Sequence, residues 1–257
     1  MSILELSLVR FTLRQALGRH RPGRWVFLGF LAVLPALIVA VVLQAGRLDA
    51  ELAQELADRE LRVAFLRDLF EGFQLPLLYP LIALLLTVPA LREEIDGDTL
   101  PYVWLKPLSR GAIVVSKYAG ALLGALFLAG LSTAVGAALL LPEGSMVGRL
   151  VLATFAALPA YGALFLVLSV WTPRALLLGL VYVIVWEGLF SRISDAASQL
   201  SVRHYAVAVE RALLGVGEPI EPSLGASLGV LLGLAVGLVA LAAWRFSRME
   251  FSGGEGS

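Results

Sequence analysis

Six apolar stretches, separated by polar segments or turns, constrain the fold of this chain more than any other feature of its sequence. They cover residues 26–43, 75–91, 118–141, 150–170, 176–190 and 224–244. An α-helix of about 20 apolar residues crosses a bilayer core of roughly 30 Å, and a helix satisfies its own backbone hydrogen bonds within lipid. We therefore expect an all-α, multi-pass membrane protein with six transmembrane helices.

The composition supports a membrane protein and excludes several classes of function. Hydrophobic residues make up 59% of the chain and charged residues 16%, whereas soluble domains have about 45–50% and about 25%. The formal net charge is zero, so no overall field attracts nucleic acid. The chain has no cysteine, which excludes disulfides, thiolate metal ligands and cysteine nucleophiles.

The expected spans divide the chain into an N-terminal segment (1–24), a transmembrane domain (25–246) and a tail (247–257). Segment 1–24 mixes apolar residues with five arginines. It is either an amphipathic helix in the membrane interface, with its arginines toward anionic headgroups, or a positive flank that orients the first span. Both interpretations place the N-terminus in the cytoplasm, and six spans then place the C-terminus there too. The Gly- and Ser-rich tail is expected to be disordered.

Two longer polar segments are expected on the outer side of the membrane. In residues 47–71, apolar residues recur at helical spacing on a charged background, which indicates an amphipathic helix outside the membrane. These apolar residues are Leu52, Leu56, Val63, Leu66 and Leu69. The helix is either a cap over a transport path or a solvated linker. Residues 191–223 are expected to form short helices at, or dipping into, the outer interface.

Prolines and one acid mark two of the spans. Pro76, Pro80 and Pro89 predict a kinked or locally opened second span, because each proline removes a backbone donor. Glu187 is the only acid within an expected span. A carboxylate within lipid is costly and commonly functional, so Glu187 is a candidate for the substrate path or for a gate. It also lies near the outer end of its span, where it can instead reach the headgroups.

Glycines recur at every fourth position of the sixth span, at Gly225, Gly229, Gly233 and Gly237. Small residues at this spacing let two helices approach closely in lipid. The series therefore predicts tight helix packing, against a helix of the same chain or of a second copy.

The connection between the second and third spans, residues 92–117, is more apolar than a solvated connector. It carries acids in its first half, bases in its second half, and between them Tyr102, Val103, Trp104 and Leu105. Exposed aromatic and aliphatic side chains beside charges are typical of an interface with another protein. The alternative is that Trp104 anchors the connection at the level of the headgroups.

We do not expect this chain to be an enzyme by itself. Glu93 and Glu94 form a paired-glutamate motif of the kind found in some intramembrane metalloproteases, but the only histidines are His20 and His204, both outside the expected spans. A zinc site of that kind therefore has no ligands, and no metal is expected. The sequence also lacks the glycine-rich phosphate-binding loop that ends in Gly-Lys-Ser or Gly-Lys-Thr.

The same connection resembles the corresponding segment in the membrane subunits of ABC type-2 transporters. In that family an acid pair is followed by a Gly-x-Thr-Leu pattern, a short apolar stretch and a Pro-x-Ser-Arg pattern. The matching residues in this sequence are Glu93, Glu94, Gly97, Thr99, Leu100, Pro107, Ser109, Arg110 and Lys117. Pro101 departs from the acidic or polar residue often found there, which leaves the start of the following helix open.

The resemblance implies a permease subunit that couples to a separate ABC ATPase, which would bind ATP and Mg²⁺. Glu93 and Glu94 would shape a cytoplasmic gate, and a helix over 99–105 would press into the ATPase. The residues implied in ATPase coupling are Glu93, Glu94, Gly97, Thr99, Leu100, Tyr102, Trp104, Leu105, Pro107 and Arg110. Segment 1–24 would be an interfacial elbow helix, and residues 191–223 would match the outer re-entrant helices of the family.

The expected function is therefore the permease of an ABC exporter in the inner membrane of a prokaryote. It would pair with a second permease copy, as a homodimer or a heterodimer, and with ATPase subunits. The alternative is a membrane scaffold or regulator that works with an ATPase but moves no substrate. A lipid-modifying enzyme is a third interpretation, and the missing metal ligands count against it.

Overall fold

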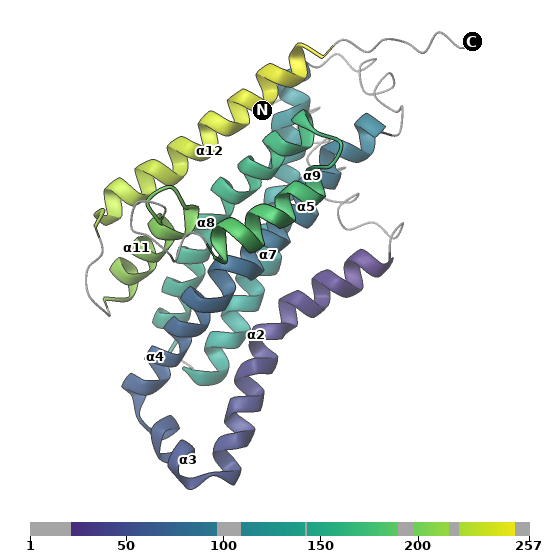
Figure 1. Cartoon of the computed structure of the whole chain (residues 1–257). Coiled ribbons are helices and arrows are strands. Elements are labelled where there is room, and N and C mark those ends of the chain that lie inside the picture. The colour runs from purple at the N-terminus through teal and green to yellow at the C-terminus, as the bar shows by residue number, and fades with distance from the viewer. Residues whose placement is uncertain (1–21, 97–108, 142, 190–197, 216–220, 250–257) are drawn as a thin grey trace.

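Every regular element that the structure describes is a helix. The computed structural model describes residues 22–96, 109–141, 143–189, 198–215 and 221–249 (Figure 1). Five stretches of helix are long and apolar enough to cross a membrane, which supports the expected multi-pass class. They are Val26–Leu48, Arg59–Glu93, Arg110–Leu140, Gly144–Trp171 and Leu224–Ser247.

The fifth expected span, over 176–190, is shorter than the others. It corresponds to α9 (Ala175–Val181) and η2 (Tyr182–Glu187), a continuous apolar helix over Ala175–Glu187. At 1.5 Å per residue such a helix covers about 20 Å, less than the bilayer core of about 30 Å. The sixth transmembrane crossing therefore stays a prediction.

Helix α8 (Gly144–Trp171) is the centre of the bundle. It packs against α5 (Tyr79–Asp96), α7 (Arg110–Leu140), α11 (Val202–Leu214) and α12 (Leu224–Ser247). Its buried side includes Tyr161, Phe165 and Leu166. The outer helices are thus held mainly through contacts with α8 and its neighbour α7.

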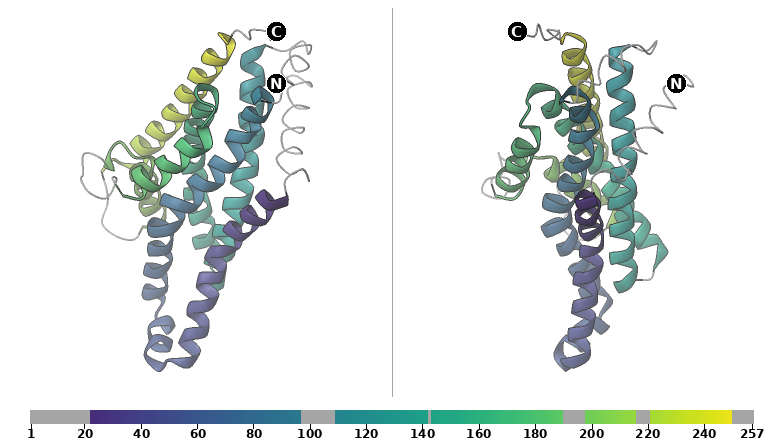
Figure 2. Two further views of the ribbon diagram at one scale, coloured as in Figure 1. Left: turned by 45° about the vertical axis from the view of Figure 1, so that its right-hand side comes forward. Right: turned by 90° about the vertical axis from the view of Figure 1, so that its right-hand side faces the viewer.

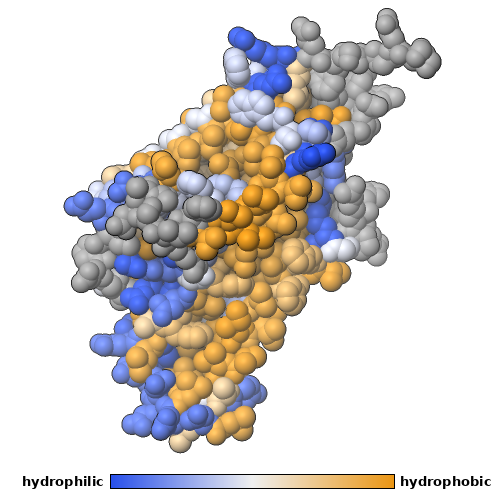
Figure 3. All heavy atoms as spheres, in the orientation of Figure 1, coloured by the Kyte–Doolittle hydropathy of each residue, from blue (hydrophilic) through white to orange (hydrophobic). Residues whose placement is uncertain are grey.

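Helices α2 (Pro22–Leu48) and α12 lie at the periphery of the bundle (Figures 1 and 2). Only 28% of the most apolar window of α2 and 22% of that of α12 are buried in the isolated chain. Figure 3 shows apolar surface over the middle of the molecule and hydrophilic residues gathered toward its ends. This distribution suits a protein whose middle faces lipid.

The bundle has two distinct ends, which we name by the helices found there. At the loop end, α5 ends, α7 begins and α12 ends. The start of α7 contacts the end of α12 there, since the Arg110 guanidinium donates to the backbone carbonyls of Ser247 and Met249. At the cap end lie α3 (Ala50–Ala57) and the start of α4 (Arg59–Leu69) (Figure 1).

The segment expected to form one external amphipathic helix, 47–71, contains two helices. Asp58 separates them: its backbone is extended, and its side chain accepts a hydrogen bond from the Glu60 amide at the start of α4. Such a cap satisfies an amide that has no partner within the helix. Helix α4 then continues into η1 (Phe70–Leu78) and α5, so its buried Val63, Leu66 and Leu69 belong to the bundle.

The prolines of the second span coincide with an opened stretch of helix. Residues Phe70–Leu78 form a π-helix that contains Pro76 and ends just before Pro80. In a π-helix the Leu75 carbonyl would accept from the amide of residue 80, and proline has none. The Tyr161 hydroxyl of α8 donates to this carbonyl at 3.3 Å, so a neighbouring helix supplies the missing donor.

Candidate functional site

A cluster at the loop end, which we call the loop-end clamp, ties the start and the end of the α5–α7 connection to three other helices. Glu93 near the end of α5 forms an ion pair of 3.5 Å with Arg24 at the start of α2. Arg92 donates to the Ser169 carbonyl of α8 at 3.5 Å. Arg110, in the first turn of α7, donates to the carbonyls of Ser247 and Met249 at 3.0 and 3.1 Å.

These contacts arise from ordinary features of helix ends. The Ser109 side chain accepts from the Ala112 amide and so caps the start of α7. The last carbonyls of α12 have no partner within their own helix, and a guanidinium is a suitable donor for them. A displacement of the α5–α7 connection would therefore be transmitted directly to α2, α8 and α12.

Only part of the predicted coupling motif lies in the described residues. Glu93 and Arg110 belong to the loop-end clamp, and Glu94 lies in the last turns of α5. The other predicted coupling residues fall outside the described residues: Gly97, Thr99, Leu100, Tyr102, Trp104, Leu105 and Pro107. The helix expected over 99–105 therefore stays a prediction. Sequence reasoning did not identify Arg24 and Arg92 as partners, although their charge at helix ends was a signal.

A cluster of hydroxyl and amide groups, the hydroxyl cluster, is buried inside the bundle. The Tyr79 hydroxyl donates to the Gln74 side chain and lies 2.6 Å from the Thr133 hydroxyl and 3.0 Å from the Thr154 hydroxyl. The four residues come from η1, α5, α7 and α8. Both threonines also donate to carbonyls one turn earlier in their own helices. The cluster joins these helices beside the opened stretch of the second span.

Charged groups gather between η1 and α11, in what we call the acid–arginine network. Arg211 forms a bidentate ion pair with Glu71, both contacts being 2.8 Å. Arg203 donates from two nitrogens to the Glu71 backbone carbonyl, at 3.2 and 3.1 Å. Because Arg203 and Arg211 lie eight residues apart, they share one face of α11. This face holds α11 against the π-helical start of the second span.

Glu210 lies in the same network and is completely buried. Neither of its carboxyl oxygens accepts a hydrogen bond from any described residue. Burial, reinforced by the nearby negative charge of Glu71, raises the pKa of Glu210 to about 8. Near neutral pH the carboxyl group is therefore largely protonated, and the protonated form can donate a hydrogen bond to Glu71.

Glu187 is also completely buried, at the end of η2. Its carboxylate accepts hydrogen bonds from the Tyr182 hydroxyl at 2.6 Å and the Ser201 hydroxyl at 2.5 Å. Ser201 in turn accepts from the Arg203 amide and caps α11. Glu187 thus fastens η2 to the start of α11, and in this arrangement the carboxylate points into the protein rather than toward the headgroups.

Two contacts anchor α11, the ion pair between Glu71 and Arg211 and the hydrogen bond between Glu187 and Ser201. A cavity of about 130 Å³ lies beside Glu71, Ser201 and Arg211. Ser198, Ser201 and Arg203 line one part of it, and Glu71 and Arg211 another. The volume is enough for a few water molecules. The structure therefore joins Glu187, which the sequence singled out, to Glu71, Glu210 and two arginines that no sequence pattern connected with it.

The glycine series of α12 faces open space in the described part of the chain. A Cβ atom added at Gly225, Gly229, Gly233 or Gly237 would meet no atom within 4 Å. By contrast, one added at Gly136 of α7 would lie 3.5 Å from Pro35 of α2. The described residues thus offer no helix of the same chain as the partner of this face, and packing against a second copy stays a prediction.

Comparison with known proteins supplies one finding. The family model described as ABC-2 family transporter protein matches residues 19–190, about two thirds of the chain. The match includes Arg24, Glu93 and Arg110 of the loop-end clamp, the hydroxyl cluster and Glu187. It ends before α11 and α12, so the part of the clamp on α12 lies outside it. No curated protein matches the sequence. Among the described residues, no group of histidine, aspartate and glutamate side chains has the arrangement of a metal site.

Proposed function

The chain belongs to the ABC-2 transporter family, and on that premise we propose that it is the permease of an exporter driven by a separate ATPase. The family assignment makes it a transporter permease of the membrane. We propose in addition that transport is outward and that the chain pairs with an ATPase. The proposal also includes a second permease copy, identical or related. The loop-end clamp is the observation that carries it.

The clamp supports a coupling role because its polar contacts join both ends of the α5–α7 connection to α2, α8 and α12. An ATPase bound to residues 97–108 would move Glu93 and Arg110, and these residues hold α2 and α12 through polar contacts. The sequence has no phosphate-binding loop of its own. ATP and Mg²⁺ would therefore be bound by the partner, on the cytoplasmic side, where we place the loop end.

The proposed transport step releases α11 from η1 and η2. Both are π-helices, whose backbone is already displaced from the α-helical pattern. Contacts of Glu71 with Arg211 and of Glu187 with Ser201 hold α11 against both. Breaking these contacts would release α11, so we propose that they form the outer gate in the closed state.

Affinity purification of the tagged chain from its native membranes, in mild detergent, tests the partner directly. We expect an ATPase with a phosphate-binding loop to co-purify in a stoichiometric amount and to be identified by mass spectrometry. Its absence across several mild detergents, with the chain itself intact and monodisperse, would contradict the proposed coupling. The family assignment does not depend on this result.

Thiol labelling separates a transporter from a scaffold that moves no substrate, because the natural chain has no cysteine. Ser198→Cys places a thiol at the cavity between the two anchoring points of α11. In membranes that contain the complex, we expect ATP to change its labelling rate several-fold as α11 is released.

The matched control is Leu48→Cys, at a residue that is 90% exposed at the end of α2. Its labelling rate is expected to stay constant. If ATP leaves both rates unchanged while the ATPase is bound and active, the scaffold function is favoured and the proposed gate is wrong.

A further inference from the structure

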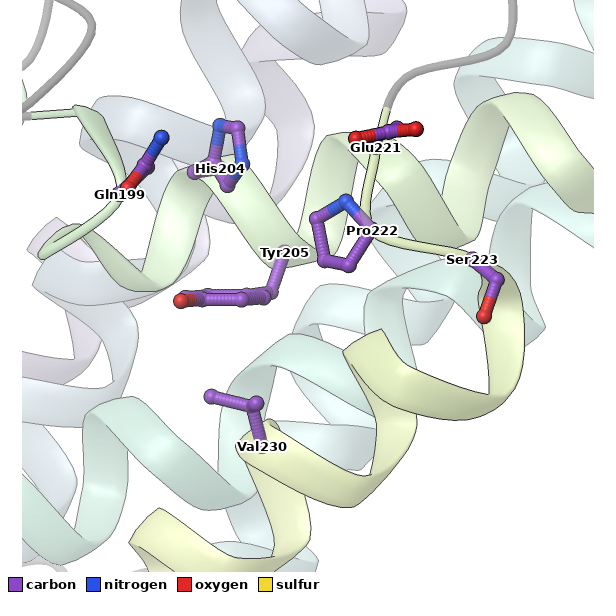
Figure 4. A pocket seen from close by; sticks show the side chains of 7 residues that line it. All are labelled: Gln199, His204, Tyr205, Glu221, Pro222, Ser223 and Val230. Atoms are coloured by element: carbon purple, nitrogen blue, oxygen red, sulfur yellow. The ribbon is translucent and has the colours of Figure 1, made fainter.

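A second and larger pocket lies between α11 and the start of α12 (Figure 4), and it shares His204 with the cavity beside the acid–arginine network. Its volume is about 620 Å³, which is in the range of sites for small ligands. Gln199, His204 and Tyr205 line it from the α11 side, and Glu221, Ser223 and Val230 from the α12 side. Figure 4 shows these side chains arranged around one open space.

The charges around the pocket favour a cation. Among the described residues that line it, Glu221 is the only aspartate or glutamate, and there is no lysine or arginine. The two arginines of α11 contact Glu71 instead, at the other site. The aromatic ring of Tyr205 lies at the pocket and packs edge-on against His204, with centroids 5.2 Å apart. Glu221 lines the same pocket beyond Pro222, and a pocket that holds both a carboxylate and an aromatic ring is a suitable environment for an ammonium group.

Neutral donors complete the lining. The Gln199 amide, the His204 ring and the Ser223 hydroxyl can each donate a hydrogen bond without adding a fixed positive charge. Such donors suit the oxygens of a phosphate that is linked to an ammonium group. Among the described lining residues, a ligand that is only anionic would meet the Glu221 carboxylate without a compensating cation.

The pocket lies where a membrane lipid would reach it. Helix α12 is one of the candidate spans, and it ends at the loop end of the bundle, so its first turns mark the opposite membrane surface. Val230 is 40% exposed, and the exposed apolar side chains of Leu234 and Leu241 continue the same face of α12. An aromatic ring at this level is typical of the membrane–water interface.

We propose that this pocket binds the headgroup of an aminophospholipid of the surrounding bilayer. The primary ammonium group lies against Tyr205 and Glu221, the phosphate accepts from the neutral donors, and the acyl chains lie along the exposed apolar face of α12. The bound lipid fills the space between α11 and α12 and so favours the packed position of α11. The inference goes beyond the transporter function and requires only that α12 spans the membrane.

Native mass spectrometry of the purified full chain in detergent tests the proposal by lipid titration. The lipids are phosphatidylethanolamine, phosphatidylcholine and phosphatidylglycerol with the same acyl chains. We expect phosphatidylethanolamine to half-saturate the chain at a concentration about tenfold below that of phosphatidylglycerol. Phosphatidylcholine is expected to lie between them, because the quaternary ammonium of phosphatidylcholine keeps the contact with the ring but cannot donate to Glu221.

Variants separate the two recognition elements. Glu221→Gln is expected to remove the preference over phosphatidylglycerol, and Glu221→Lys to reverse it, a gain that loss of folding cannot produce. Tyr205→Leu is expected to weaken phosphatidylethanolamine binding about fivefold, whereas Tyr205→Phe keeps the ring and its affinity. Glu55→Gln, at an exposed acid of α3, is the matched control and is expected to bind like the natural chain.

The proposal is overturned if the three lipids bind equally, or if Glu221→Gln keeps the natural preference. A competition arm with free phosphoethanolamine identifies the source of the ammonium group. If the soluble compound displaces the lipid at equal concentration, the pocket takes a soluble amine and the lipid assignment is wrong. Failure to compete, together with the expected order of the lipids, supports the bilayer as the source.

Discussion

Replacing Trp104 and Leu105 by aspartate is expected to separate the chain from its ATPase. In the proposed complex these two apolar side chains are buried against the partner, and aspartate would bring two carboxylates into that interface. Losses of about 2 kcal/mol or more are common for such central residues, so we expect the affinity to fall by roughly two orders of magnitude. The measurement is the amount of ATPase that co-purifies with the tagged chain.

The control for this result is Leu61→Asp, at a half-exposed position in the first turn of α4 near the cap end. An acid is tolerated in the first turn of a helix, so this variant is expected to keep the ATPase. If the double variant retains the ATPase while remaining as abundant and monodisperse as the control, residues 99–105 are not the docking element. Trp104 would then be an anchor at the headgroups.

Replacing Glu210 by glutamine is expected to remove a large part of the pH dependence of stability. The pKa of Glu210 is raised from about 4.5 to about 8, first by burial and then by the charge of Glu71. A folded state with the higher pKa binds the proton more tightly than the unfolded state. The contribution of Glu210 to stability is therefore complete below about pH 4.5 and is lost as the pH rises through 8.

The lost contribution is on the order of 3 kcal/mol at pH 9, the scale set by a shift of a few pKa units. Other charged groups near Glu210 are Glu71 on η1, Arg67 on α4 and its neighbour Arg211. Glutamine keeps a neutral side chain at every pH. We therefore expect Glu210→Gln to unfold at a temperature roughly 5–10 °C above the natural chain at pH 9, and at nearly the same temperature at pH 5.

Thermal unfolding in one detergent, followed at pH 5, 7 and 9, checks this expectation. Glu55→Gln on exposed α3 serves as the control and is expected to follow the natural chain at each pH. Parallel curves for Glu210→Gln and the natural chain between pH 5 and pH 9 would show that Glu210 takes up no proton on folding. The outer gate proposed above would then contain an ionised acid, and its closure would need a different explanation.

The sequence by itself determined the class of the protein and the position of most of its spans. Apolar runs are sufficient for this because the bilayer imposes a fixed thickness and forbids unpaired backbone groups. Five of the six expected spans correspond to helices that are long enough to cross a membrane. The connection after the second span identified the family from its residues alone, and the family match agrees.

The tertiary structure decided which polar groups meet, because those contacts join residues far apart in the chain. Glu71 and Arg211 are 140 positions apart and Arg110 and Met249 are 139 apart, and neither pair follows from a helical period. The burial of Glu210 depends on α11 packing against the bundle, which its own sequence does not specify. Local patterns set each helix and its apolar face, whereas the packing of the helices against one another sets the clamp, the pocket and the contacts of the proposed gate.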